Sequence, residues 1–386
     1  MELIAEEYKQ TEVGLIPVDW DVKEFVEVMD GFSSGQTPYR AITEYYRGDI
    51  PWITSGELNY NVITDTNEKI TIEGSRAANL KMIPKGTFLF AITGLEAAGT
   101  RGSCAITGIE ATTNQSCMAL YPKKGILITQ YLYHYYVRYG DELAFKYCQG
   151  TKQQSYTGAI AKKLPIIVPP TIAEQTAIAT ALSDADALIS SLEKLIAKKR
   201  NIKQGAMQKL LEPKEGWEVK KLGKVAPLQR GFDLPNRDLF KGKYPVVYSN
   251  GIVNYHHKFQ AKAPGIVTGR SGTIGKVNFI QEDYWPHNTT LWVTNFMGNY
   301  PLFVYFLFLK VGLERFATGS GVPTLNRNDV HDFAVSIPDY DVQASIANIL
   351  SDMDAEINAL EAKLVKYRNV KLGMMQNLLT GKIRLI

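Results

Sequence analysis

The sequence predicts a duplicated α+β protein, in which a globular domain with a short-stranded sheet is followed by one long helix, twice over. Residues 175–211 and 343–379 align without a gap at an offset of 168 residues and are identical at twenty of 37 positions. Identity at this level within one chain indicates internal duplication. Both copies carry apolar residues with the spacing of a helix that packs against another helix. The segments before each copy contain short apolar runs between glycines, which is the pattern of short strands and turns.

The composition is that of an ordinary globular protein. The chain has 386 residues, 45% hydrophobic and 21% charged, enough for two or three domains. A net charge of +4 permits nucleic-acid binding without arguing for it, because a basic patch matters more than the total. Cys104, Cys117 and Cys148 form no CxxC pair and suit a reduced, cytoplasmic chain. The first 14 residues lack the features of a signal peptide, and the apolar run 302–309 is too short to span a bilayer.

Each globular domain is expected to combine short strands with one aromatic-rich helix. The runs GTFLFAIT, CMALYP, YPVVYS, GIVTG and LWVTN have the composition of strands. Residues 128–147 and 300–310 have the composition of helices. Their aromatic side chains have two interpretations, base stacking or core packing and subunit docking, of which the second is the more common use.

Two long helices are predicted to run from near Thr171 to 211 and from near Tyr340 to 379, each after a proline that cannot lie inside a helix. Apolar residues follow alternating steps of four and three along both helices. Such a narrow stripe favours packing of the two helices on each other over burial on separate cores. The predicted seam consists of Ile178, Leu182, Ile189, Leu192, Ile196, Ile346, Leu350, Ile357, Leu360 and Leu364.

Four motifs, at matching places in a duplicated chain, resemble those of the specificity subunits of type I restriction-modification systems. They are GLIPVDWDV near the start, the paired segments LPIIVPPTIAEQTAI and VSIPDYDVQASI, the LSDAD and LSDMD helices that end in MQKLL and MQNLL, and the terminal LLTGKIRL. The similarity covers essentially the whole chain. The second copy departs from the family pattern, because Asp341–Val342–Gln343 stand where the first copy has Ala173–Glu174–Gln175.

The resemblance implies a non-catalytic subunit that recognises double-stranded DNA. Two target recognition domains would each bind one half of a split site, and two conserved helices would pair as an antiparallel coiled coil. The helices would dock two modification subunits, which are N6-adenine methyltransferases, and restriction subunits would join through the complex. S-adenosylmethionine, ATP and magnesium are expected on the partner subunits only, and no membrane partner is expected. The implied boundaries are 1–170 for the first recognition domain with a short N-terminal conserved segment, 171–211 for the central helix, 212–339 for the second recognition domain and 340–386 for the C-terminal helix.

Three pairs of loops are the candidates for DNA contact, because loops on a rigid scaffold commonly carry binding residues. The pairs are residues 30–38 with 228–235, 97–103 with 270–276, and 150–158 with 319–329. The first pair shares a Gly-Phe dipeptide and differs in its polar residues. Loops that share their backbone-determining residues but differ in their polar side chains are expected for two domains that bind different half-sites. A single Arg or Gln on such a loop is, however, more often only solvated.

The candidate residues in these loops are donors and acceptors suited to base edges or phosphates. In the first domain they are Ser33, Ser34, Gln36, Arg101, Lys152, Gln153 and Gln154. In the second domain they are Gln229, Arg230, Arg270, Ser271, Asn326 and Arg327.

Charged residues of the long helices carry a further expectation. The Asp residues of LSDAD (182–186) and LSDMD (350–354) are predicted to face solvent or a protein partner instead of forming an acid pair. Basic residues around the first helix form either a solvated face or a basic strip near the DNA between half-sites. These basic residues are Lys194, Lys198, Lys199, Arg200 and Lys203.

Catalysis is the rival class, and the sequence offers little for it. No Asn/Asp-Pro-Pro-aromatic tetrapeptide of an adenine methyltransferase is present, and 269–277 fails the phosphate-loop spacing. A nuclease site from Asp339, Glu361 and Lys363 is disfavoured because Glu361 lies on the heptad helix. Two non-catalytic functions also stay open: the DNA-recognition partner of a fused methylase-nuclease, and a coiled-coil scaffold that binds no DNA.

Overall fold

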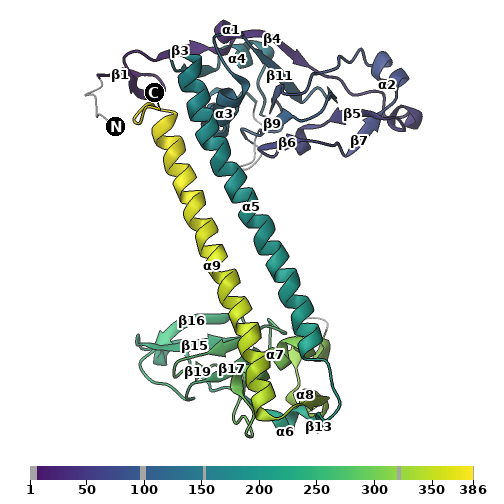
Figure 1. The fold of residues 1–386 in the computed structure, drawn as a ribbon, viewed down its shortest axis with the longest axis vertical. Coiled ribbons are helices and arrows are strands. Elements are labelled where there is room, and N and C mark those ends of the chain that lie inside the picture. Colours follow the sequence, from purple (N-terminus) through teal and green to yellow (C-terminus); the bar gives the residue numbers. More distant parts are fainter. Residues whose placement is uncertain (1–6, 96–100, 151–153, 320–322, 386) are drawn as a thin grey trace. The chain divides into compact units, whose positions relative to one another are not determined.

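The computed structural model describes residues 7–95, 101–150, 154–319 and 323–385 (Figure 1). The chain divides into two compact units. The first unit is Met1–Ser191 with Leu364–Ile386, and the second unit is Leu192–Lys363. The division falls inside both long helices, so each helix contributes one part to each unit.

The first unit is built on a five-stranded mixed sheet. In spatial order its strands are β4 (Met29–Ser34), β11 (Cys117–Pro122), β8 (Phe88–Ala91), β9 (Cys104–Thr107) and β6 (Asn61–Ile63). Neighbouring strands are antiparallel except β6 and β9, which are parallel. Strand β8 is buried throughout because α3 (Thr129–Tyr147) packs on the sheet, with the Tyr136 ring edge-on to Phe88 and Phe90 at 5.5 and 5.2 Å between centroids.

Smaller elements complete the first unit. Its remaining strands form the sheet β10 (Thr112–Thr113), β5 (Ile50–Ile53) and β7 (Glu68–Ile70), the hairpin β1 (Tyr8–Thr11) and β2 (Gly14–Pro17), and the pair β3 (Asp21–Glu24) and β12 (Pro165–Val168). Its short helices are α1 (Phe25–Val28), α2 (Ile72–Ala77), α4 (Gly158–Lys162), η1 (Thr43–Tyr46) and η2 (Ser55–Glu57).

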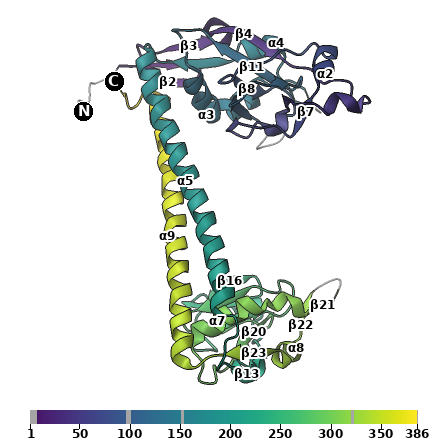
Figure 2. The same cartoon turned by 45° about the vertical axis from the view of Figure 1, so that its right-hand side comes forward.

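The second unit is also built from small sheets, the largest of which has four strands (Figure 2). They are β14 (Leu228–Arg230), β20 (Thr290–Val293), β17 (Gly265–Gly269) and β18 (Val277–Ile280); β16 (Gly251–His256), β15 (Tyr244–Tyr248) and β19 (Trp285–Pro286); β13 (Glu218–Lys221) with β23 (Ala334–Ile337); and β21 (Ala317–Thr318) with β22 (Thr324–Leu325). Its short helices are α6 (Leu222–Val225), α7 (Pro301–Val311), α8 (Arg327–Asp332), η3 (Asn236–Asp238) and η4 (Leu313–Phe316).

The strand order confirms the duplication. The order β4-β11-β8-β9 in the first unit corresponds to β14-β20-β17-β18 in the second, and β10-β5-β7 corresponds to β19-β15-β16. The first unit adds β6 to the main sheet and the hairpin of β1 and β2. The predicted α+β fold with short-stranded sheets is therefore confirmed in both halves.

The aromatic helices serve the cores of the units, as the more common of their two interpretations predicts. Tyr131 and Tyr135 are almost fully buried, and their hydroxyls donate to the carbonyls of Ile167 and Pro165 in β12, each at 3.0 Å. In α7, Phe303, Phe306 and Phe308 are buried in the core of the second unit. The rings of these five buried residues are therefore not available to stack on a base.

The long helices are α5 (Ile172–Leu210) and α9 (Tyr340–Leu378), within one or two residues of the predicted ends. In the first unit, Ile178 and Leu182 of α5 share a core with Met375 and Leu378 of α9. Of the predicted seam, Ile189 and Leu360 are half-buried and the other eight residues are buried. The heptad stripes thus mark buried faces, and a continuous coiled-coil seam stays a prediction.

An equivalent buried glutamine joins each long helix to the aromatic helix of its unit. Gln175, 1% exposed, accepts from the N–H of Ile128 at the start of α3 (3.1 Å) and donates to the carbonyls of Ile126 (2.8 Å) and Pro169 (3.3 Å). Gln343, 3% exposed, accepts from the N–H of Tyr300 at the start of α7 (2.9 Å) and donates to the carbonyl of Pro338 and the side chain of Asn299. The identity of these two residues in the repeat therefore has a structural cause.

Ion pairs join the helices within each unit and correct the expectation for two Asp residues. Asp186 pairs with Lys371 in the first unit, and Asp354 pairs with Lys203 in the second, each at 2.5 Å. The offset of 168 residues relates both partners of one pair to those of the other. The last Asp of each LSDxD pentapeptide therefore faces the other helix instead of solvent, whereas Asp184 and Asp352 are exposed.

The surroundings of these two ion pairs differ between the units. In the first unit the α3 residue beside the pair is His134, whose Nε2 lies 2.9 Å from the Ser183 hydroxyl and whose Nδ1 lies 4.0 Å from Asp186. Burial, and to a smaller degree the Lys371 charge, lower the pKa of His134 to about 4. In the second unit the Lys203 ammonium lies 5.5 Å from the centre of the Phe306 ring, so an aromatic residue takes the place of the imidazole.

No helix within the described residues is long and apolar enough to cross a membrane. Cys104, Cys117 and Cys148 are free thiols, and the first two are buried.

Candidate nucleic-acid interface

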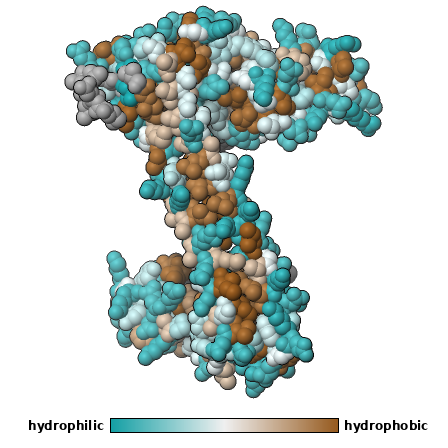
Figure 3. All heavy atoms as spheres, viewed as in Figure 1, coloured by the Kyte–Doolittle hydropathy of each residue, from teal (hydrophilic) through white to brown (hydrophobic). Residues whose placement is uncertain are grey.

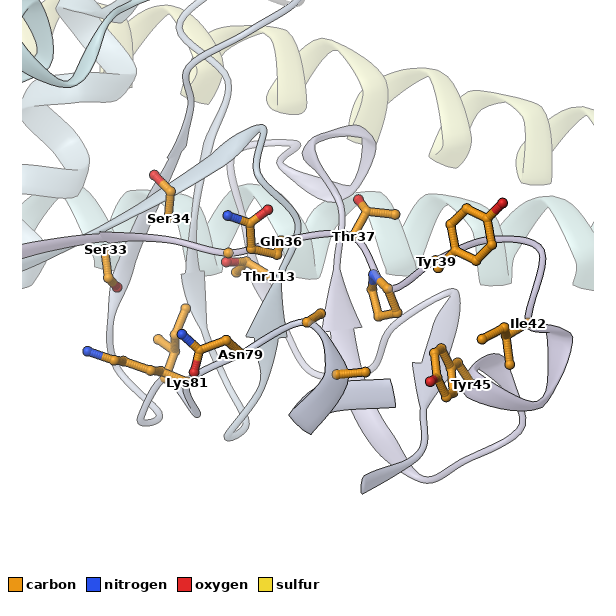
Figure 4. Close-up of a pocket in the computed structure, with 15 residues that line it drawn as sticks. Ser33, Ser34, Gln36, Thr37, Tyr39, Ile42, Tyr45, Asn79, Lys81 and Thr113 are labelled. Atoms are coloured by element: carbon orange, nitrogen blue, oxygen red, sulfur yellow. The ribbon is translucent and has the colours of Figure 1, made fainter. Parts of the chain in front are cut away.

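A hollow of about 710 Å³ lies beside the end of β4 in the first unit (Figure 4). Its lining comes from β4, the loop after β4, the segment after α2 and strand β10. Three candidate residues, Ser33, Ser34 and Gln36, lie in this lining. The first loop set therefore forms one wall of a concave surface whose lining combines polar and apolar residues, as binding sites commonly do.

The backbone of this wall is held firmly while the Gln36 side chain stays exposed. Gln36 donates its N–H to the carbonyl of Thr113 (3.2 Å), and its own carbonyl accepts from the indole of Trp52 (3.1 Å). The hydroxyl of Ser33 lies 3.0 Å from that of Tyr121 on β11. A fixed backbone with a free amide is suited to recognition of a polar edge.

The opposite wall comes from residues that the sequence did not single out. Figure 4 shows Asn79 and Lys81 near Ser33 and Gln36, with Tyr39, Ile42 and Tyr45 at the other end of the hollow. Asn79 follows the end of α2 with a left-handed backbone (φ +48°), a conformation that Asn tolerates better than most residues. The Asn shortly after this helix is a sequence signal that could have placed the segment at a turn.

The second unit has a hollow of about 390 Å³ beside β14, the strand that corresponds to β4. It brings together residues of all three second-domain loops, which are far apart in sequence. Its lining is Arg230, Arg270, Leu291, Thr324, Leu325, Asn326 and Arg327. Figure 2 shows β21, β22 and α8, which frame its third loop, at one side of the unit.

Backbone hydrogen bonds fix the loops around this hollow. The N–H of Arg270 donates to Thr289 (2.8 Å) and its carbonyl accepts from Leu325 (2.8 Å). The imidazole of His331 on α8 accepts from the N–H of Leu228 at the start of β14 (2.8 Å), and burial and the neighbouring Arg327 charge lower the pKa of His331. A neutral imidazole can accept this hydrogen bond, so α8 holds β14 in place.

The three arginines of the hollow have different surroundings. Arg230 forms an ion pair with Asp233 (2.8 Å), and Asp233 also accepts from Asn288. Arg270 and Arg327 are exposed, and neither side chain has a hydrogen bond or an ion pair among the residues that the structure describes. Two guanidinium groups are thus available to a ligand.

The remaining candidates lie outside the hollows. Gln229 is exposed on β14, and Ser271 forms an isolated bridge with Thr324. Gln154 accepts from the N–H of Leu95 through its backbone carbonyl. Lys152 and Gln153 fall outside the described residues.

Arg101 is held by its own unit. Its guanidinium lies 3.2 Å from the carboxylate of Asp141 on α3 and 5.5 Å from the centre of the Phe145 ring. Its side chain is 18% exposed. Arg101 therefore links residues 101–103 to α3.

The structure corrects the register of the first loop pair. Met118 of β11 lies opposite Ser34, and the corresponding Leu291 of β20 lies opposite Arg230. Gly35 and Gly231 are then equivalent, and each lies so close to a neighbouring backbone carbonyl that no side chain would fit. The shared Gly-Phe dipeptides, at 31–32 and 231–232, are therefore not equivalent.

The same ladders correct the counterpart of Arg270. Ala91 pairs with Cys117 as Gly269 pairs with Thr290, so Arg270 corresponds to the buried Ile92 and not to Ala97. The pairing of residues 97–103 with 270–276 misplaced Arg270, because the first copy has more residues between the strand and this loop.

Most of the basic residues around α5 belong to the helix pair. Within the second unit, Lys199 pairs with Glu356 and Arg200 with Glu361, each at 2.6 Å, in addition to Lys203 with Asp354. Lys194 and Lys198 are exposed. The residues weighed for a nuclease site have structural roles as well, since Glu361 pairs with Arg200 and Asp339 accepts from the N–H of Val342 at the start of α9 (3.1 Å).

The missing acidic position of the second copy also has a structural meaning. Glu174, 3% exposed, binds the guanidinium of Arg384, which also contacts Asp19 at 3.1 Å and lies over the Trp20 ring. Val342, at the equivalent place in α9, is 41% exposed. The acidic residue is thus needed where the C-terminal segment 380–385 packs within the first unit.

Two units with corresponding strand orders, each with its own hollow and with parts of both long helices, define a duplicated recognition protein. The type I restriction modification DNA specificity domain matches residues 17–204 and again 214–366. The chain therefore belongs to the family of type I restriction-modification specificity subunits.

Individual relatives agree with this family. The MjaIX specificity subunit of Methanocaldococcus jannaschii is 25% identical over 98% of this chain and 96% of that subunit. The EcoR124I/EcoR124II specificity subunit of Escherichia coli is 24% identical over 48% of this chain and 45% of that subunit. Among solved structures, the S subunit from M. genitalium superposes with a TM-score of 0.63 at 16% identity, covering 93% of this chain and 96% of that one.

Proposed function

We propose that this chain is the non-catalytic subunit that recognises a split DNA target for a type I methyltransferase complex, with one half-site bound by each unit. The observation that carries the proposal is that the two units have corresponding strand orders but different hollows. The same strand order carries a hollow lined by amides, hydroxyls and Lys81 in the first unit and a hollow lined by three arginines in the second. Two different polar surfaces on one repeated scaffold suit two different half-sites.

The partner subunits are proposed to dock on the long helices. The face of α5 that carries Leu188, Leu195 and Ile202 repeats every seven residues, and these side chains are 36%, 38% and 46% exposed. Figure 3 shows hydrophobic residues at the surface along both long helices. Exposed apolar rows of this kind mark protein contact sites. S-adenosylmethionine, ATP and magnesium would then be bound by the modification and restriction subunits, which carry the chemistry.

A domain exchange tests the proposal. Residues 18–163 are replaced by those of a relative with another target, and the methylated sequence is mapped with the assembled complex. A change in only one half of the motif is expected, because each unit has its own recognition surface. A change in both halves would contradict recognition by separate units. A scaffold that binds no DNA predicts no selective binding at all, and a fused methylase-nuclease in the neighbouring genes would identify the chain as the recognition partner of that enzyme.

A further inference from the structure

The second unit places three arginines where the first unit has uncharged residues. By strand register, Arg230 corresponds to Ser34 and Arg270 to Ile92. Asn326 and Thr157 both cap the short helix that follows, so Arg327 corresponds to Gly158. Every half-site has the same phosphate backbone, so phosphate contacts would be kept in both copies. Cations confined to one copy are instead suited to something that differs between the half-sites, which is the base sequence.

The hollow of the second unit offers donors almost exclusively. Its arginines can donate only, and the Asn326 side-chain oxygen already accepts from the N–H of Asn328 (3.0 Å), which leaves its amide hydrogens. No carboxylate lines this hollow among the described residues. In the major groove, guanine presents two acceptors, N7 and O6, whereas adenine and cytosine each present an amino group that needs an acceptor. A surface of donors therefore matches guanine.

Arg270 is the best placed of the three. Its backbone is fixed on both sides by hydrogen bonds to Thr289 and Leu325, and Leu291 and Leu325 beside it are 2% exposed. Its guanidinium is exposed and unpaired among the described residues, unlike that of Arg230, which is held by Asp233. A rigid attachment with a free fork of donors is the arrangement that bidentate recognition needs.

We propose that the second unit recognises a guanine in its half-site through Arg270, and that the first unit recognises its half-site without an arginine at this place. The proposal rests on the proposed function, because it names the base that one recognition surface selects. The first hollow presents one ammonium group, that of Lys81, and the amides of Gln36 and Asn79, which both donate and accept, whereas the second presents three guanidinium groups.

The test uses the complete complex with its methyltransferase subunits and duplexes that carry each base pair in turn at every position of the motif. Arg270→Gln removes the charge and the fork, and Lys258→Gln removes the same charge at an exposed residue outside the hollow. Arg270→Gln is expected to reduce discrimination at one G·C pair of the second half-site by about 5- to 150-fold, the range for one bidentate contact. Lys258→Gln is expected to keep that discrimination.

The remaining outcomes separate the two claims. A second half-site without guanine would overturn the inference. So would a uniform loss of affinity for all duplexes with a shallower salt dependence in Arg270→Gln, because that is the signature of a phosphate contact. Absence of any bipartite preference in the wild-type complex would instead refute the proposed function. Arg327→Gln measured beside Arg270→Gln shows whether a second guanine contact lies in the same hollow.

Discussion

Replacing Gln175 by leucine tests whether the repeated glutamine holds the long helix to the recognition domain. The side chain is 1% exposed and makes three hydrogen bonds, to the N–H of Ile128 and the carbonyls of Ile126 and Pro169. A net loss of roughly 1 kcal/mol for each hydrogen bond gives a destabilisation of about 3 kcal/mol. For a unit of this size, that corresponds to a fall in melting temperature of roughly 6–12 °C.

The assay is differential scanning calorimetry of the purified chain, with hydrogen exchange at the start of α3. Gln204→Leu, at an exposed glutamine of the same helix, is the matched control and is expected to melt within about 1 °C of the wild type. Gln343→Leu is expected to repeat the effect in the second unit, with faster exchange near Tyr300. If Gln175→Leu melted like Gln204→Leu, the link between helix and domain would not depend on this residue.

Three further predictions concern other parts of the chain. Burial lowers the pKa of His134 to about 4, so the unfolded chain binds a proton at this imidazole more readily than the folded chain does. The stability of the first unit is therefore expected to fall by up to about 3 kcal/mol as the pH drops from 6.5 towards 4. In melting curves His134→Phe should show a weaker dependence of stability on pH, and an unchanged dependence would contradict the role of His134. Arg384→Gln, which breaks the contacts with Glu174 and Asp19, is expected to cost about 2 kcal/mol and to expose 380–385 to proteolysis, whereas Lys382→Gln at an exposed residue should change neither. Insertion of seven residues into both long helices adds about 10 Å of helix and should lengthen the preferred DNA spacer between the two half-sites by about three base pairs. An unchanged spacer would refute the role of the helices in setting its length.

The helices and the duplication could be predicted because their signals are local or repeated. Heptad spacing, the prolines before each helix and twenty identities determine both long helices to within two residues. Periodicity could not show that Asp186 and Asp354 face the partner helix, because that depends on which residue of the other helix lies opposite. The partners become visible only when the pair is seen to repeat with Lys371 and Lys203.

The candidate sites were predicted less completely, since they depend on tertiary register. Arg230, Arg270 and Arg327 come from three loops that the sequence identified separately and the fold brings together. Asn79 and Lys81 were missed because their segment has no recognisable counterpart in the second copy. The Gly-Phe dipeptides misled the alignment because the closely packed glycines are Gly35 and Gly231, each beside a backbone carbonyl.

The central claim is that this chain gives a methyltransferase complex a split target with one half for each unit. The most direct measurement maps methylated adenines in cells that carry the complex, with and without this chain. A motif of two short specific parts separated by a fixed spacer, with one methylated adenine in each part, is predicted, and it should disappear when the chain is absent. A continuous motif, or a methylation pattern that does not depend on the chain, would contradict the account.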